Sequence, residues 1–197
     1  MATNFMAAYR MRILQLFINN NLEEPINWNL SEDNKTESGT STWSEISMFN
    51  DIQVEVYLNA NCCSILKTDV TGISTKRLTE ELILGILEES IVDDIEEIKP
   101  IILRTETDIA YIAIFNKVFY ENLISKLDEL GKPIRFVQSF AFSTKFNVDC
   151  WTVFLNKEQS FIRTSKYEYF LLDNATPIPE ILIDMAKTEK PKSILIY

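Results

Sequence analysis

The sequence predicts a two-lobed α/β protein with mixed sheets, and three observations support this fold class. Runs in which apolar and polar residues alternate, the pattern of strands with one buried face, occur near both ends of the chain. At each end these strands are followed by a helix and a further strand, so the two ends share one plan. The middle of the chain adds another helix and a strand–helix–strand segment. We therefore expect a flexible N-terminus over residues 1–9, a first lobe over 10–72, a central region over 73–139, and a second lobe, truncated at its C-terminal end, over 140–197.

The composition argues against several classes of function. The chain has 197 residues, enough for a full core, and a net charge of −10, which argues against binding to nucleic acid or directly to an anionic membrane surface. An acidic protein is more naturally matched with a basic protein surface. The absence of histidine removes His-based triads, His-ligated zinc and the usual proton shuttle. Catalysis would therefore have to rest on carboxylates alone. We expect no catalytic residue, no metal site and no cofactor.

The cysteines and the apolar runs indicate where the chain resides. Cys62, Cys63 and Cys150 are an odd number, and two of them are adjacent in an expected strand, which suits a reducing compartment. Residues 1–10 do not form a signal peptide. The longest apolar runs are far shorter than the ~20 residues that span a bilayer. We expect the chain as given to be soluble.

The first lobe is expected to contain several strands and one short helix. Residues 32–41 are rich in Ser, Thr, Asn and Glu, which predicts a flexible surface loop. Thr42 and Glu45 have the spacing of a capping box, so a helix should follow over residues 43–49. The expected strands cover residues 12–18, 26–31, 51–58 and 63–70.

The central region begins with a strongly apolar helix that Ser74 or Thr75 should cap. Its apolar residues cover more than half of the helix circumference, which predicts a helix held between two layers. These residues are Leu78, Leu82, Ile83, Ile86 and Leu87. Between residues 78 and 98 the chain has eight acids and no base. An acidic segment, which we define as Glu88, Glu89, Asp93, Asp94, Glu96 and Glu97, is therefore the candidate partner-binding site.

The rest of the central region reads as a strand, a helix and a strand, which we expect to form a compact unit. Residues 109–115 are apolar on both faces, as in an internal strand covered by helices, and residues 105–108 should form a loop. The following helix has a clear apolar stripe and should end at Leu130, because Gly131 and Pro133 cannot continue it.

The second lobe is expected to be a three-stranded meander followed by a helix and a strand. The meander starts at Trp151, carries Arg163 in its hairpin and turns over residues 156–159. Pro177 and Pro179 should open the helix. Residues 193–197 form an apolar strand with no following element, so we expect the full protein to continue through another helix into a membrane span.

The acidic segment and the order of elements resemble a known family. Leu87-Glu88-Glu89 followed by Asp93-Asp94 and Glu96-Glu97 is similar to a segment of the cytoplasmic domain of type II secretion system protein L, and the order of strands and helices resembles that family across nearly the whole chain. The resemblance implies an actin-like, ribonuclease H-like fold, which the shared plan of the two ends also indicates. The sequence departs from the family at three places. A proline is usual where this chain has Gly72-Ile73-Ser74, Pro-Asp is usual where it has Gln138-Ser139, and its Trp-led hairpin lacks the expected glycine.

The resemblance also implies a function and partners. It implies a non-catalytic scaffold at the cytoplasmic side of the bacterial inner membrane, which holds the N-terminal domain of the secretion ATPase together with the small membrane protein M. A homodimer is compatible with it, and a membrane span beyond this chain would anchor the protein.

An actin-like fold raises the alternative of an ATPase, which the turns do not support. Such enzymes wrap phosphates with two hairpin turns rich in Asp and Gly, since only glycine lets the backbone N–H groups approach the oxygens. Neither residues 19–25 nor residues 156–159 contain glycine, and the chain has no GxxxxGK[ST] motif. Two alternatives remain, which are a nucleotide-binding actin-like pilus-assembly protein of the M type and a small-molecule binding module. Glycine at the turns would favour the former, and a large apolar pocket the latter.

Overall fold

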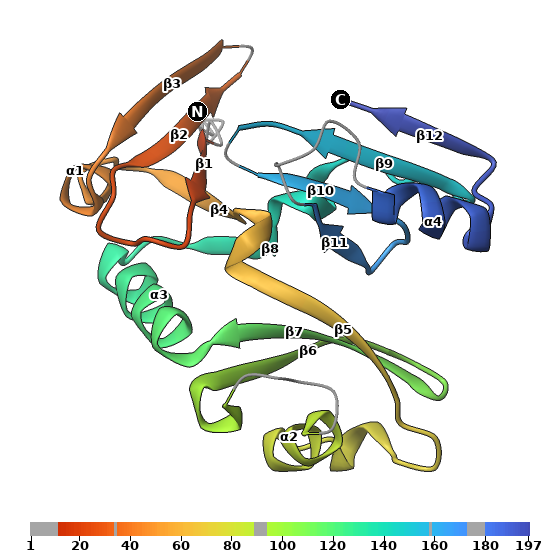
Figure 1. Ribbon diagram of the computed structural model, residues 1–197. Helices are drawn as coiled ribbons and strands as arrows, with labels where there is room; N and C mark the ends of the chain where they lie inside the picture. The colour runs from red at the N-terminus through yellow and green to blue at the C-terminus, as the bar shows by residue number, and fades with distance from the viewer. Residues whose placement is uncertain (1–11, 34, 89–93, 158, 173–179) are drawn as a thin grey trace, which may run out of the picture.

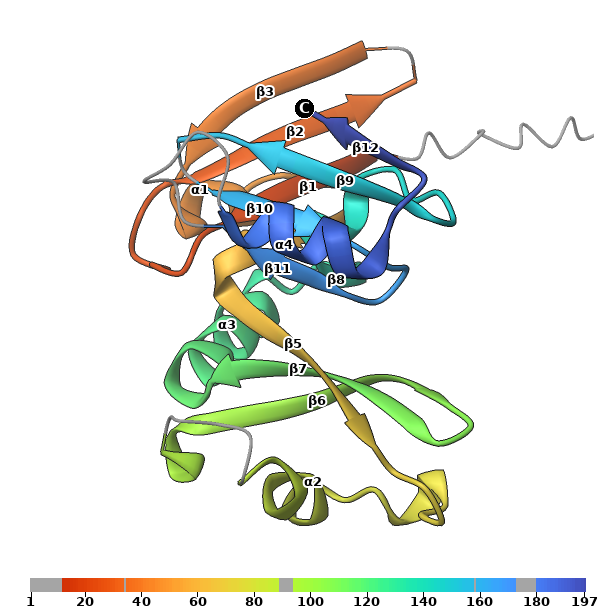
Figure 2. The same ribbon diagram turned by 45° about the vertical axis from the view of Figure 1, so that its right-hand side comes forward.

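Twelve strands in three sheets, with four α-helices, make up the described part of the chain (Figure 1). The computed structural model describes residues 12–33, 35–88, 94–157, 159–172 and 180–197. Two of the sheets belong to the two lobes, and the third lies beneath them in the view of Figure 1. Figure 2 shows β5, a strand of the third sheet, running from the lobes to the end where α2 lies.

The first sheet has five strands in the order β3-β2-β1-β4-β8. The pairs β1–β2 and β2–β3 are antiparallel, whereas β4 pairs in parallel with both β1 and β8. Inward-facing residues of β1 and β4, such as Leu14, Leu16 and Val56, share one core with Ile46 of α1 and Leu123 of α3. The elements are β1 (Arg12–Ile18), β2 (Ile26–Glu32), β3 (Lys35–Ser41), α1 (Trp43–Ser47), β4 (Ile52–Leu58), α3 (Lys117–Leu130) and β8 (Ile134–Ser139).

The prediction of a flexible loop over residues 32–41 is wrong, because most of this segment forms strand β3. Its polar composition fits an edge strand, whose side chains are largely exposed while its backbone bonds to β2. Gly39 faces Trp28 across this pair, and the indole ring occupies the space that a side chain would need. The capping box before α1 is confirmed, since Thr42 N donates to Glu45 Oε2 (2.8 Å) and Glu45 N donates to Thr42 Oγ1 (3.4 Å).

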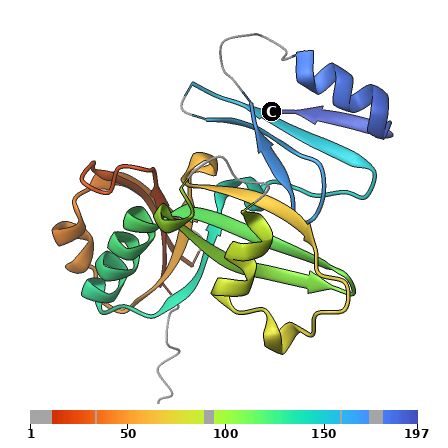
Figure 3. The ribbon, with the colours of Figure 1, turned by 60° about the horizontal axis from the view of Figure 1, so that its bottom comes forward.

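The second lobe has three strands, a helix and a further strand, the same order as at the start of the first lobe, as the sequence predicts. Its sheet has the order β11-β10-β9-β12, with an antiparallel meander and a parallel pairing of β12 with β9. Met185 and Ala186 of α4 pack on Trp151, Val153 and Ile162. Figure 3 shows α4 on the side of this sheet that points away from α3. The elements are β9 (Cys150–Leu155), β10 (Ser160–Arg163), β11 (Tyr169–Leu171), α4 (Glu180–Glu189) and β12 (Ser193–Ile196).

The third sheet is antiparallel, with β7 between β5 and β6. Residues on one face of β7, such as Ile112, pack with Ile83 and Leu87 of α2, and residues on the other, such as Ala113, join the core of the first lobe. The prediction of an internal strand covered on both faces is therefore confirmed. The elements are β5 (Cys63–Asp69), α2 (Glu80–Leu87), β6 (Ile98–Glu106) and β7 (Ile109–Asn116).

Two further expectations for the central region need correction. Helix α2 starts at Glu80 after the cap Thr79, not at Ser74, and Leu82 is exposed, so α2 covers one face of the third sheet and is not held between two layers. Strand β6 was not expected from the sequence, and it includes Thr105 and Glu106 of the expected loop.

The strand, helix and strand of the central region are β7, α3 and β8, but they do not form a separate unit. β7 belongs to the third sheet, whereas β8 pairs with β4 in the first. The division of the chain at residues 72 and 139 stays a prediction. Gly131 ends α3 in the left-handed conformation (φ 59°), as expected.

Candidate functional site

The described acids of the acidic segment lie at the α2 end of the third sheet. Glu88 follows α2, Asp94 caps the short 3₁₀ turn Ile95–Glu97, and all four described acids are exposed. Asp94 Oδ1 accepts a hydrogen bond from Glu96 N (3.0 Å). Glu89 and Asp93 lie outside the described residues. The structure thus brings Asp94, Glu96 and Glu97 together, and none of them forms an ion pair with another described residue.

The turns over residues 19–25 and 156–159, which contain no glycine, face one small cavity between the lobes. Asn19 and Pro25 come from the turn after β1, and Asn156 and Gln159 from the turn after β9. The cavity has a volume of about 250 Å³, below the range of ~300–1,000 Å³ typical of small-molecule sites. The cavity therefore lies where a nucleotide would bind between two lobes, but its volume is smaller than that of a typical small-molecule site.

Three backbone N–H groups of the first turn are already bonded within the turn. Asn21 N donates to Asn19 Oδ1 (3.0 Å), Glu23 N to Asn21 Oδ1 (3.1 Å), and Glu24 N to Asn21 O (3.3 Å). The Glu24 carboxylate accepts from the side-chain amides of Asn19 (2.7 Å) and Asn21 (3.0 Å). Phosphate binding needs free N–H groups and positive potential, whereas this turn offers bonded N–H groups and a carboxylate.

Two groups of the second turn also form hydrogen bonds with the protein. Asn156 N donates to Ser160 Oγ (3.3 Å), and Gln159 Oε1 accepts from Ala60 N of the first lobe (2.7 Å). The Gln159 side chain therefore connects the turn of the second lobe to the 3₁₀ turn Ala60–Cys62 that follows β4.

Aromatic rings line the cleft behind these turns. Phe140 contacts Phe17 of the first lobe edge-on at 6.3 Å and Phe154 of the second lobe at 5.5 Å between ring centroids. Phe154 stacks on the fully buried Phe161 at 5.2 Å, and Tyr57 stacks on Phe17 at 5.5 Å. These rings fix the lobes against each other by packing.

Tyr169 of β11 joins the second lobe to the first by hydrogen bonds. Its hydroxyl lies 2.9 Å from both Ala60 O and Cys63 O, and 3.4 Å from Cys63 Sγ. The side chain is only 3% exposed, and this burial, followed by the neighbouring Cys63, raises the pKa of its hydroxyl. This role of Tyr169 was not predicted from the sequence, because its partners are more than a hundred positions away.

A larger, mainly apolar groove lies where the first lobe, the third sheet and the turn after β10 meet. Its volume is about 590 Å³, and its walls include Ile101 of β6, Tyr120 of α3 and Val137 of β8. Arg163, which the sequence placed in the hairpin, lies in its lining together with Lys166. A large apolar pocket is the feature predicted above to favour a small-molecule binding module.

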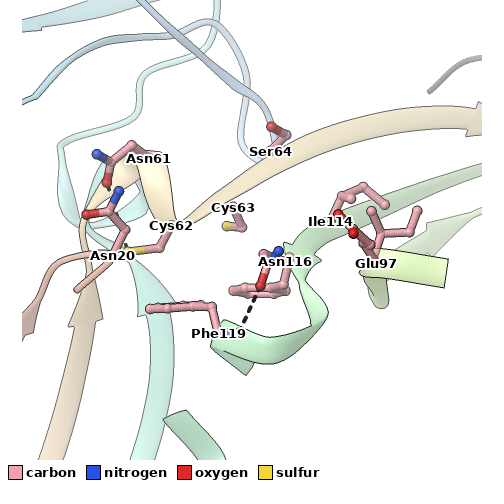
Figure 4. Close-up of a pocket in the computed structure, with 11 residues that line it drawn as sticks. Asn20, Asn61, Cys62, Cys63, Ser64, Glu97, Ile114, Asn116 and Phe119 are labelled. Atoms are coloured by element: carbon pink, nitrogen blue, oxygen red, sulfur yellow. Dashed lines mark hydrogen bonds between the residues drawn. The ribbon is translucent and has the colours of Figure 1, made fainter. Parts of the chain in front are cut away.

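A third, more polar pocket of about 460 Å³ lies between the first lobe and the third sheet (Figure 4). Asn20, Asn61 and Asn116 line it, with Asn116 Oδ1 accepting from Phe119 N at the start of α3 (3.0 Å). Glu97 of the acidic segment lines the same pocket. The adjacent Cys62 is not an activated nucleophile, because burial raises the pKa of its thiol to about 12.

Comparison with known proteins identifies the fold. No family model matches the chain, and no curated protein matches it in sequence. Among solved structures, the cytoplasmic domain of EpsL, an inner membrane component of the type II secretion system of Vibrio cholerae, aligns with a TM-score of 0.68 at 15% identity, over 82% of this chain and 71% of that one. A PilM–PilN type IV pilus biogenesis complex aligns with a TM-score of 0.51 at 12% identity, over 91% of this chain and 66% of that one. The fold is actin-like.

The interlobe cavity lies where an ATPase with an actin-like fold would bind its nucleotide. The turns after β1 and β9 are the ones that would wrap phosphates in an ATPase of this fold. Here three N–H groups of the first turn, and that of Asn156 in the second, are bonded within the protein. Within the described residues no group of three or more Cys, Asp or Glu side chains could hold a metal ion. No helix in the described ranges is both long enough and apolar enough to cross a membrane.

Proposed function

We propose that this chain is a non-catalytic scaffold of a type II secretion system, the cytoplasmic domain of an L-type protein of the inner-membrane platform. The observation that carries the proposal is the interlobe cleft. Three backbone N–H groups of its first turn donate hydrogen bonds within the turn, and the Glu24 carboxylate lies beside them. Aromatic rings pack behind this turn. The fold shared with the cytoplasmic domain of EpsL supports the same assignment.

The proposed partner is the N-terminal domain of the secretion ATPase, which the scaffold recruits to the membrane for protein export. The acidic segment supports this partner, because Asp94, Glu96 and Glu97 lie exposed and without ion pairs in the described part of a protein of net charge −10. A field of this kind accelerates encounter with a basic surface. The small membrane protein M, a membrane span outside this chain and a homodimer complete the proposed assembly.

Titration calorimetry with Mg-ATP tests the scaffold function. We expect no binding heat, because a nucleotide would have to break the hydrogen bonds of the first turn and approach Glu24. A nucleotide-binding actin-like protein serves as the positive control. A micromolar dissociation constant would contradict the scaffold and favour an M-type pilus-assembly protein.

A binding assay tests the partner independently of the nucleotide. The N-terminal domain of the secretion ATPase encoded in the same genome is immobilised, and association of this chain is followed by surface plasmon resonance. Saturable binding that weakens with salt is expected. Failure to bind, with the chain folded, would remove the ATPase as partner while leaving the calorimetric result unaffected.

A further inference from the structure

The groove between the first lobe and the third sheet combines exposed apolar side chains from three elements. Leu103 of β6, Ile124 of α3 and Val137 of β8 line it with exposures of 43%, 38% and 42%. They belong to three different elements, β6 of the third sheet, α3 and β8 of the first sheet, which the fold brings together in one patch. Contiguous exposed apolar surface of this kind, around a cavity of about 590 Å³, is typical of a binding site.

The charge in this groove is opposite to that of the protein. The chain carries a net charge of −10, yet the charged side chains that line the groove are Arg163 and Lys166, with no carboxylate among the described lining residues. The two cations come from neighbouring positions, since Arg163 ends β10 and Lys166 lies in the following turn. Both charged side chains of the lining are therefore cations, on a protein that is acidic as a whole.

Arg163 is a buried cation without a carboxylate partner among the described residues. It is 6% exposed and donates to the carbonyl oxygens of Phe142, Thr144, Ser165 and Lys166, while the rings of Phe142 and Phe146 lie over its guanidinium. These contacts hold the side chain in place, and none of these partners is an anion. The ammonium of Lys166 is exposed and lies 5.1 Å from the Tyr167 ring centroid.

The other side chains of the groove are mainly apolar. Besides Arg163 and Lys166, the polar side chains of the lining are those of Tyr120, Gln138, Ser139 and Tyr167, and Ser139 Oγ accepts from Ala141 N (3.3 Å). A ligand with one anionic end and a chain without polar atoms matches these apolar walls and the two cations.

We propose that this groove binds a single-chain amphipathic carboxylate, whose apolar chain lies against Leu103, Ile124 and Val137 and whose carboxylate lies beside Lys166 and the charge of Arg163. This site is separate from the interlobe cleft and from the acidic segment. It adds a ligand to the scaffold that its proposed function does not require.

Calorimetry with dodecanoate below its micellar concentration tests the proposal. We expect saturable one-to-one binding, and at least roughly tenfold weaker binding of dodecyltrimethylammonium, because the same chain then carries the opposite charge. Equal affinity for the two amphiphiles would overturn the role of the cations. Absence of dodecanoate binding would overturn the site altogether.

Matched variants locate the ligand without touching Arg163, whose removal would disturb four carbonyl contacts. Lys166→Glu should weaken dodecanoate binding by roughly tenfold, while Lys187→Glu, the same change at an exposed position of α4, should leave it unaltered. Ile124→Asn should weaken binding, while Val118→Asn on the same helix but outside the groove should not. Equal effects within either pair would place the ligand elsewhere.

Discussion

The hydroxyl of Tyr169 provides a direct test of how the second lobe is held on the first. Tyr169→Phe removes one oxygen and keeps the ring, which packs on Phe142 and Phe161 at 5.3 and 6.1 Å between centroids. The change therefore isolates the hydrogen bonds to Ala60 O and Cys63 O from the aromatic packing.

The expected magnitude follows from burial and from the number of protons. One hydroxyl proton serves two carbonyl oxygens, each at 2.9 Å, so the variant loses about one hydrogen bond and leaves buried oxygens without this donor. Such a loss costs about 1–3 kcal/mol of unfolding free energy. For a chain of 197 residues, about 2 kcal/mol corresponds to a fall in Tm of roughly 4–8 °C.

Urea unfolding followed by tryptophan fluorescence measures this difference, because Trp28 reports on the first lobe and Trp151 on the second. Tyr197→Phe, at an exposed position, is the matched control and should change stability by less than about 0.5 kcal/mol. If the Tyr169 variant were as stable as this control, the hydroxyl would not contribute to joining the lobes.

Three further predictions concern packing, titration and charge. Gly39→Ala should cost about 1–3 kcal/mol of stability, since the new Cβ would lie 2.6 Å from Trp28 Cζ2, whereas Gly85→Ala in α2 meets nothing within 4 Å and should stabilise by about 0.5–1 kcal/mol; urea unfolding of both variants checks the pair. The pKa of the Cys62 thiol rises from roughly 8.5 in the unfolded chain to about 12 in the folded protein, so its contribution to stability is full below pH ~8.5 and is lost towards pH 12. The unfolding free energy of the Cys62→Ala variant, measured with urea, should therefore fall less steeply with rising pH than that of the parent. An identical decline would refute this. Reversing the charges of the four acids between residues 93 and 97 should lower the association rate with the ATPase domain by ~10-fold or more at low salt and weaken its salt dependence; unchanged kinetics with an intact fold would move the interface to another face.

The elements that the sequence predicted correctly are those whose patterns are local. The capping box at Thr42 and Glu45, the stop of α3 at Gly131 and the continuous apolar run of β7 each lie within a few residues. The edge strand β3 was missed because its composition is that of a loop. Strand β6 was missed because Pro100 and the charged residues near its ends obscure its pattern.

The sequence by itself determined the actin-like plan, the absence of glycine from the two turns and the position of the acidic segment, because these depend on residue type and on short-range order. Tertiary structure alone decided that the two turns share one cavity and that Tyr169 and Gln159 join the lobes. It also decided that β8 completes the first sheet and that Leu103, Ile124 and Val137 meet Arg163 in one groove. These contacts connect positions that are distant along the chain, and a single sequence carries no local pattern that relates them.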